Sequence, residues 1–204
     1  MTEAEVVTPK GRETRESVLG VARNLASTVG LDGLTIGTLA DSAGMSKSGL
    51  YAHFGSKEDL QCAVLDATAE DFKNTAVLPA FKAPRGIPRI EKLFWNWVEW
   101  EGMGHDGGCP ILAAATEYDD RPGAIRDKTL DYVSQMIGVL DRAAQIAIEE
   151  GHFRADLDTR QFAYELWGVL LAQQHYLRLL ETKDAPKLAK GAFDSMIDRA
   201  RPQA

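Results

Sequence analysis

The stretch DSAGMSKSGLYAHFGSKEDL, residues 41–60, decides the fold that we predict for this chain. Gly44 separates two short segments of helical periodicity, because glycine accepts the left-handed conformation in which many helices end. Ser46 can cap the second segment, since its hydroxyl can accept a hydrogen bond from an exposed amide. Leu50 and Phe54 lie one turn apart on the inner face of that segment. The stretch therefore predicts two short helices joined by a tight turn, a helix-turn-helix.

The second of these helices has a polar outer face. With Leu50 and Phe54 facing inward, the side chains left to face outward are Lys47, Ser48, Gly49, Tyr51 and His53. A helix can lie in the major groove of DNA only if its outer face is slim and polar. Gly49 costs roughly 1 kcal/mol relative to alanine inside a helix, and a close approach of the backbone to another surface would explain its presence.

Positions on either side of this helix suit phosphate groups. Lys57 lies in the first turn of the next helix, where exposed amides and the helix dipole favour an anion. Thr35, which can cap the preceding helix, offers a hydroxyl and nearby amides to a phosphate on the other side. The predicted DNA contacts are therefore Thr35, Ser46, Lys47, Ser48, Gly49, Tyr51, His53 and Lys57.

The overall charge does not favour nucleic acid. The net charge is −7, with 23 Lys and Arg against 30 Asp and Glu, so DNA binding requires a local basic surface. Residues 1–60 hold six basic and eight acidic residues, and four of those acids precede the motif or lie early in the first helix. The positions of the basic residues matter more for DNA binding than the net charge, because counterion release depends on cations within reach of phosphates.

Composition places the chain among globular, intracellular proteins. Its 204 residues are 45% hydrophobic, which is enough for a substantial core. Cys62 and Cys109 fit no metal-binding spacing and favour a reducing compartment. The start MTEAEVVTPKGRE lacks the apolar run of a signal peptide, and the longest apolar runs are too short to span a bilayer. We expect a cytoplasmic protein with no membrane partner, no metal and no cofactor.

Helical periodicity continues through the rest of the chain, interrupted by turn signals. Apolar residues recur at three- and four-residue spacing on the expected helices 13–29, 56–78, 90–98, 122–150, 159–180 and 186–201, with a short helix between 110 and 118. Gly30 and Gly151 are placed to end helices, and Pro122 and Pro186 to begin them. The segment 79–88, with three prolines and a glycine, is the best candidate boundary within the chain, and the segment 102–110 is a flexible break. No strand is convincing, so the predicted class is all-α with about nine helices.

The segment TVGLDGLTIGTLADSAGMSKSGLYAHFGSKEDL, residues 28–60, resembles the DNA-binding domain of the TetR/AcrR family of transcriptional regulators. The resemblance covers about residues 12–67 and implies DNA contacts at the positions named above. Two positions depart from the family pattern: Gly37, where members often carry an arginine, and Gly49, where many carry Thr, Ser or Ala. Both changes remove side-chain readout, so no operator sequence carries over from relatives.

The resemblance also implies the organisation of the remaining chain. We expect a helix-turn-helix domain at residues 1–67 and a helical effector-binding and dimerisation domain at residues 68–204. The last two helices, 159–180 and 186–201, are the expected dimer surface, and the alternative is that they close the core of a monomer. The implied function is that of a dimeric repressor that binds a near-palindromic double-stranded DNA operator and is released by a small effector. The helix from Ser56 to about Leu78 is the expected lever between the two regions.

Aromatic residues concentrate in LFWNWVEW, residues 93–100, and suggest an apolar pocket. The candidate ligand-binding residues are Phe94, Trp97, Trp100, Met103, Tyr118, Met136, Trp167, Leu171 and His175. They favour a small apolar or aromatic effector, with His175 as a polar anchor. Core packing is the alternative for each of them, and His175 could equally be a solvated histidine.

Other functions find less support. A nucleophilic Cys109 with His105 as base, or a metal site that adds Asp106, has too few neighbours in sequence, and residues 107–110 are more typical of a loop before a helix. Residues 117–121 are typical of a charged helix end, so we expect no catalytic residues. A helical small-molecule carrier or interaction module without operator binding remains the alternative function.

Overall fold

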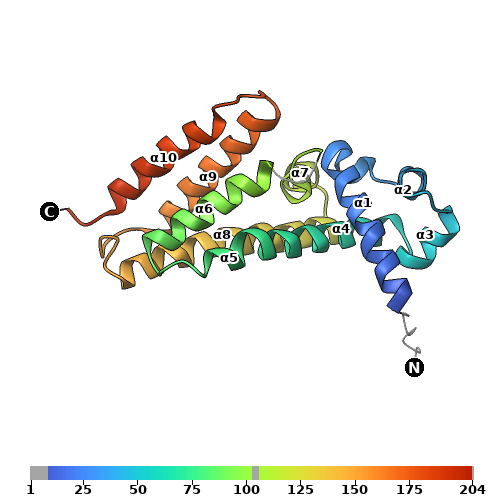
Figure 1. The fold of residues 1–204 in the computed structure, drawn as a ribbon, viewed down its shortest axis with the longest axis horizontal. Helices are drawn as coiled ribbons and strands as arrows, with labels where there is room; N and C mark the ends of the chain where they lie inside the picture. The colour runs from blue at the N-terminus through green and yellow to red at the C-terminus, as the bar shows by residue number, and fades with distance from the viewer. Residues whose placement is uncertain (1–8, 103–105, 204) are drawn as a thin grey trace. The chain divides into compact units, whose positions relative to one another are not determined.

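The computed structural model describes residues 9–102 and 106–203, and every regular element within these ranges is a helix. The all-α prediction is confirmed. The described residues form two compact units (Figure 1). The first contains residues 9–68 and 106–129, and the second contains residues 69–102 and 130–203.

The first unit contains the N-terminal helices and a later segment. Its helices are α1 (Pro9–Gly33), α2 (Ile36–Ala43), α3 (Lys47–Phe54), the first part of α4 (Lys57–Phe72), α7 (Pro110–Glu117) and the start of α8 (Ala124–Glu149). The segment 106–129 thus packs with the N-terminal helices, whereas we expected it in the second domain. Its contacts with the end of α1, described below, give the physical reason.

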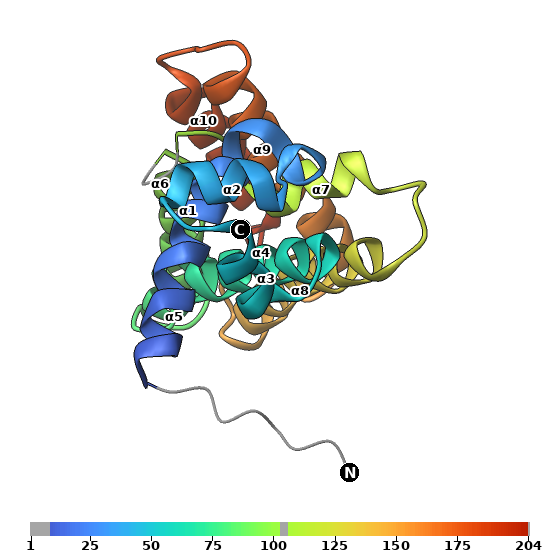
Figure 2. The ribbon, with the colours of Figure 1, turned by 90° about the vertical axis from the view of Figure 1, so that its right-hand side faces the viewer.

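Local capping forms the helix-turn-helix as its sequence predicts. The Thr35 hydroxyl accepts from the Thr38 amide at 3.1 Å, and the Thr38 hydroxyl accepts from the Thr35 amide at 3.0 Å, which closes a reciprocal cap on α2. Gly44 ends α2 in the left-handed conformation, with φ 63°. The Ser46 hydroxyl accepts from the Gly49 amide at 3.1 Å and so starts α3. Figure 2 shows the turn between α2 and α3.

A small apolar core holds these helices together. Leu31, Leu34, Leu39 and Leu50 are each 0% exposed, and Phe54 is 4% exposed. The Arg15 guanidinium of α1 lies 5.2 Å from the centre of the Phe54 ring, within range of a cation–π interaction. The inner face of α3 is therefore fully used in packing, as its sequence predicts, and only its outer face is left for a partner.

The second unit is a set of helices around an aromatic core. It contains the end of α4, the π-helical turn η1 (Lys73–Val77), α5 (Leu78–Ala80), α6 (Ile87–Gly102), most of α8, α9 (Thr159–Arg178) and α10 (Ala185–Ala200). The Asn96 amide donates to the Ala76 carbonyl at 2.8 Å and supplies a buried partner to the π-helical turn. Helices α9 and α10 pack side by side as an antiparallel pair (Figure 1).

All the predicted helices occur, but some boundaries differ: α1 and α6 extend three or four residues beyond the predicted ranges 13–29 and 90–98 at each end, and α8 begins later than predicted. Asp158 caps α9 through the amides of Arg160 and Gln161, and a proline stands in the first turn of α10. Pro122 does not begin a helix: α8 starts at Ala124, because Gly123, with φ 146°, breaks the helical conformation between them. That prediction was wrong. The candidate boundary at residues 79–88 lies inside the second unit and does not separate the two units.

Candidate nucleic-acid interface

The outer face of α3 is open to solvent. Tyr51 is 52% exposed, Lys47 and Ser48 are exposed, and Gly49 and His53 are half-buried. Leu50 and Phe54 lie on the opposite face, in the core. The predicted contact residues of α3 therefore share one surface that presents an ammonium group, a hydroxyl and a phenol, the chemical groups that bind base edges and phosphates.

Glycines on α2 and α3 leave room around the two capping residues. A Cβ on Gly37 would lie 3.6 Å from both the Lys47 ammonium and the Thr35 hydroxyl. The Lys47 side chain therefore extends past Gly37, where a longer side chain would contact it. A Cβ on Gly49 would lie 3.2 Å from the Ser46 hydroxyl, which is tight. The absence of a side chain at Gly49 thus leaves the Ser46 cap undisturbed. This is a local explanation for the glycine, in addition to the close approach of the α3 backbone to another surface.

Lys57 does not stand alone in the first unit. Its ammonium donates to the Asp32 carbonyl oxygen at 2.8 Å and lies 3.6 Å from the Asp32 carboxylate. Arg121 approaches the other carboxylate oxygen of Asp32 at 3.5 Å. Two cations, Lys57 and Arg121, therefore share the Asp32 carboxylate. A phosphate at the start of α4 would compete with this carboxylate for Lys57.

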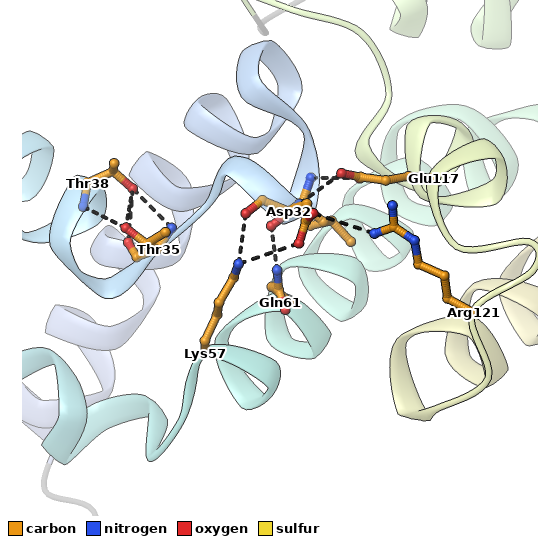
Figure 3. A network of polar contacts seen from close by, with 8 residues as sticks. Asp32, Thr35, Thr38, Lys57, Gln61, Glu117 and Arg121 are labelled. Carbon is orange, nitrogen blue, oxygen red and sulfur yellow. Dashed lines mark hydrogen bonds and ion pairs between the residues drawn. The ribbon is translucent and has the colours of Figure 1, made fainter.

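A network of side chains fixes the turn at the end of α1, residues 30–33 (Figure 3). Gly30, with φ 73° and ψ 172°, breaks the helical conformation and exposes the amides that follow. The Glu117 carboxylate accepts from the amides of Leu31 and Asp32 at 3.1 and 3.0 Å. The buried Gln61 side chain donates to the Leu31 carbonyl. Partners from α4 and α7 thus satisfy the polar groups that this turn would otherwise leave unpaired.

A second set of contacts ties the segment before α7 to α1. The Asn24 side chain exchanges two hydrogen bonds with Asp106, at 2.7 and 3.0 Å. The Gly107 amide donates to the Ser27 hydroxyl, and the Gly108 amide to the Ser27 carbonyl at 3.0 Å. A Cβ on Gly107 would lie 1.7 Å from that carbonyl oxygen, so only glycine fits here. These contacts explain why residues 106–129 belong to the first unit.

The candidate ligand-binding residues do not form one group. Phe94, Trp97, Trp100 and Met136 are buried in the second unit, where Trp167 and Leu171 are half-buried and His175 is exposed. Tyr118 is buried in the first unit, beneath the Arg121 guanidinium. Burial raises the pKa of Tyr118, and the nearby charges of Asp32 and Glu117 raise it further. Met103, and His105 of the alternative catalytic reading, lie outside the described residues.

The rings of α6 pack against three other helices. Trp97 is 2% exposed, and its ring centre lies 4.6 Å from that of Phe72 and 5.9 Å from that of Trp167. Phe94 stacks on Phe193 of α10 at 4.3 Å. The Trp100 indole donates to the Asp71 carboxylate at 3.2 Å. These side chains contribute to core packing, whatever else they bind.

Sequence reasoning overlooked two buried polar residues of the second unit. Glu101 is 8% exposed and Gln173 is 2% exposed, and the polar side-chain atoms of both lack hydrogen-bond partners among the described residues. A signal for Glu101 was present in the sequence, since it occupies the next position of the apolar stripe Ile90–Phe94–Trp97 on α6. Gln173 likewise continues the buried stripe of Leu166 and Leu170 on α9.

The fold and the exposed face of α3 define an all-helical protein with an N-terminal DNA-binding motif. Within the described ranges, no helix has the length and apolar character needed to cross a membrane. Residues 18–64 match the family model for bacterial regulatory proteins of the tetR family, and residues 86–193 match the model of the tetracyclin repressor-like C-terminal domain. The chain belongs to the TetR family of bacterial regulatory proteins.

Individual relatives agree with this assignment. The chain is 30% identical over 91 residues to the HTH-type transcriptional repressor AcnR of Corynebacterium jeikeium (strain K411). The matched segment covers 45% of this chain and 47%, about half, of AcnR. The crystal structure of a TetR transcriptional regulator from Chloroflexus aurantiacus J-10-FL superposes with a TM-score of 0.83 at 26% identity, over 94% of this chain and 96% of that one. AibR, in complex with isovaleryl coenzyme A and operator DNA, has the same fold, with a TM-score of 0.71 at 18% identity over 94% of this chain and 100% of that one.

Proposed function

We propose that this protein is a ligand-responsive transcriptional repressor that binds a near-palindromic operator as a dimer in the cytoplasm. The observation that carries the proposal is the exposed outer face of α3, with Tyr51 52% exposed between Lys47 and His53. The repressor AcnR and the operator complex of AibR supply the family precedent. The proposed DNA contacts are the eight residues predicted from the sequence, with α3 as the recognition helix.

Dimerisation through α9 and α10 is part of the proposal. A groove of about 590 Å³ runs between these helices, lined mainly by small and apolar side chains such as Ala172, Ala189 and Leu188. Two large side chains that line it are exposed, Tyr176 at 42% and Leu188 at 50%, and Tyr164, also on α9, is 72% exposed. Gln173 also lines the groove, and its unpartnered amide would gain a hydrogen bond from a second copy. Such a surface is typical of a two-fold interface between helical pairs.

The effector belongs to the second unit in this proposal. The AibR complex contains isovaleryl coenzyme A together with operator DNA, which is a precedent for one chain that binds both. Helix α4 begins beside the recognition helix and continues through η1 and α5 to Ala80. An effector that binds better to a conformation with poorly spaced recognition helices would therefore release the operator, by as much as its affinity differs between the two conformations.

The test removes one cation from the recognition helix. Lys47→Ala should lower operator affinity by about tenfold or more while the helical content stays unchanged, because a phosphate or base contact is lost. Lys92→Ala, an exposed lysine of α6, makes the same charge change in the second unit and should leave affinity unchanged. Gel-shift titration with DNA fragments selected by the purified protein measures both variants. Equal affinities for wild type and Lys47→Ala would favour a carrier without operator binding.

A further inference from the structure

Glu101 is a buried acid that no side chain of the described protein satisfies. Its side chain is 8% exposed, and neither carboxylate oxygen has a partner of good hydrogen-bond geometry among the described residues; the Trp97 indole, one turn away, interacts with it only weakly. Buried polar groups in folded proteins almost always have a partner, and an ionised carboxylate left alone costs several kcal/mol. A residue of this kind commonly marks a binding site.

Its position directs Glu101 toward the aromatic interior of the second unit. Ile90, Phe94, Trp97 and Glu101 follow one another at spacings of four, three and four residues, so they share one face of α6. The first three side chains of this face are 1–2% exposed, and Trp97 contacts Phe72 and Trp167. The carboxyl group thus stands at the end of an aromatic surface, where an apolar side chain would pack more favourably.

Burial has the expected effect on the acid. It raises the pKa of Glu101 to about 8, and the Trp97 indole one turn away opposes the rise only in part. The free protein therefore keeps Glu101 largely protonated at neutral pH and avoids most of the cost of a buried charge. A cation placed beside the carboxylate would reverse this preference and supply the missing hydrogen-bond donor.

We propose that Glu101 binds a positively charged nitrogen of the effector, whose apolar part lies against the aromatic side chains of α6. An ammonium group would neutralise the carboxylate and donate to it, and the faces of tryptophan rings attract cations as well. A neutral apolar effector would leave the acid unpartnered, and a carboxylate effector would bring a negative charge into the apolar interior with no cation to balance it. The inference rests on the proposed function, since it names the chemical class of its effector.

The experiment compares three probes with one ring system and different charge. Isothermal titration of the full chain, without DNA, uses 1-naphthylmethylamine, 1-naphthalenemethanol and 1-naphthoate. Wild type should bind the amine about ten- to a hundredfold more tightly than the alcohol, as expected for a charge-assisted hydrogen bond, and bind the naphthoate weakest. Glu101→Gln should reduce the preference for the amine to about twofold or less. Glu99→Gln, an exposed acid of the same helix, should keep it.

The outcomes are decisive in both directions. Loss of the preference in Glu101→Gln together with its retention in Glu99→Gln supports the inference. Equal binding of amine and alcohol, tighter binding of naphthoate, an unchanged preference in Glu101→Gln, or no binding of the amine at about 1 mM each overturns it. Operator binding is measured separately by gel shift, so a protein that binds its operator without a preference for cations would contradict this inference and leave the proposed repressor function standing.

Discussion

Asp32 decides how much of the Lys57 charge is available to DNA. It holds the lysine through both its carbonyl and its carboxylate, and its side chain is 58% exposed. An exposed ion pair of this kind is weak in water, yet it sits where the sequence predicts a phosphate contact. The acid thus acts as a competitor for a phosphate, and its removal should strengthen DNA binding.

Asp32→Asn should raise operator affinity about two- to fivefold at low salt, because Lys57 no longer has a competing carboxylate. Asp41→Asn removes the same charge from the exposed face of α2 without touching Lys57, so it measures the general effect of charge. Lys57→Ala should weaken binding to all sequences alike and reduce the salt slope by about one. Salt-dependent gel-shift titrations report all three variants. A larger gain for Asp41→Asn than for Asp32→Asn would contradict the competition.

Glu101 should make the stability of the second unit depend on pH. Its pKa is raised from 4.5 to about 8 in the folded state, so folding is favoured by the proton that Glu101 retains. This contribution is complete below the unfolded pKa and is lost as the pH rises to about 8. The free energy of unfolding of wild type, relative to Glu101→Gln, should therefore fall by roughly 3–5 kcal/mol between pH 5 and pH 8.

Urea unfolding followed by tryptophan fluorescence measures this loss. All four tryptophans, residues 95, 97, 100 and 167, lie in the second unit, so the signal reports on that unit. Glu99→Gln should follow wild type at both pH values, because Glu99 is exposed. A constant difference between wild type and Glu101→Gln across this range would show that Glu101 is already ionised and paired.

At the scale of elements, α7 and the segment before it belong to the DNA-binding half of the described chain. Glu117 at the end of α7 accepts from two amides of the turn at the end of α1, and Gly107 lies against the backbone of α1. The first unit therefore contains residues 106–129 as well as the residues before the predicted domain boundary near residue 67. This boundary alone does not divide the two units. Helices α4 and α8 each begin in the first unit and end in the second. The chain therefore passes between the units through these two helices.

Gly107→Ala tests the attachment of this segment to α1. Its Cβ would lie 1.7 Å from the Ser27 carbonyl oxygen, so the backbones must separate, and we expect a loss of about 2–3 kcal/mol in stability of the first unit. Gly20→Ala on an open face of α1 is the matched control and should stabilise the helix by about 0.5–1 kcal/mol. Hydrogen exchange of the α1 amides measures both changes. Unaltered protection of α1 in Gly107→Ala would show that the contact is unimportant.

At the scale of the whole molecule, the proposed function requires two copies of the chain. One recognition helix makes few contacts with DNA, and a two-fold pair reads two half-sites of an operator. The groove between α9 and α10, with exposed apolar side chains around it, is the surface that we propose for the pair. A substitution that disrupts this groove should therefore prevent dimerisation while each chain still folds.

Leu188→Glu should convert the dimer to a monomer at micromolar concentration, because it places a charge in the apolar groove. Operator affinity should fall by about a hundredfold or more as the second half-site is lost. Leu130→Glu is the control, since Leu130 is a leucine of similar exposure, 55%, on α8. Sedimentation velocity gives the oligomeric state. A dimeric Leu188→Glu variant would place the interface elsewhere.

Much of the DNA-binding unit could be predicted from residues close together in sequence. The caps at Thr35 and Ser46 and the turn at Gly44 depend on neighbours within four residues, as does the cap at Asp158 in the second unit, so local chemistry suffices for them. The start of α8 could not be predicted in this way. Pro122 is compatible with a first helical turn, but the conformation of Gly123 moves the start beyond it.

The amino-acid sequence by itself determined the all-α class, the helix-turn-helix and the outward face of α3, because helical periodicity and capping are short-range properties. Only the tertiary structure decided that Asp32 holds Lys57, that Glu117 and Gly107 join residues 106–129 to α1, and that Glu101 is buried without a partner. Asp32 and Lys57 are 25 residues apart, and Glu117 bonds to amides about 85 residues away. Such partners are chosen when helices pack, and no local pattern of residues encodes them.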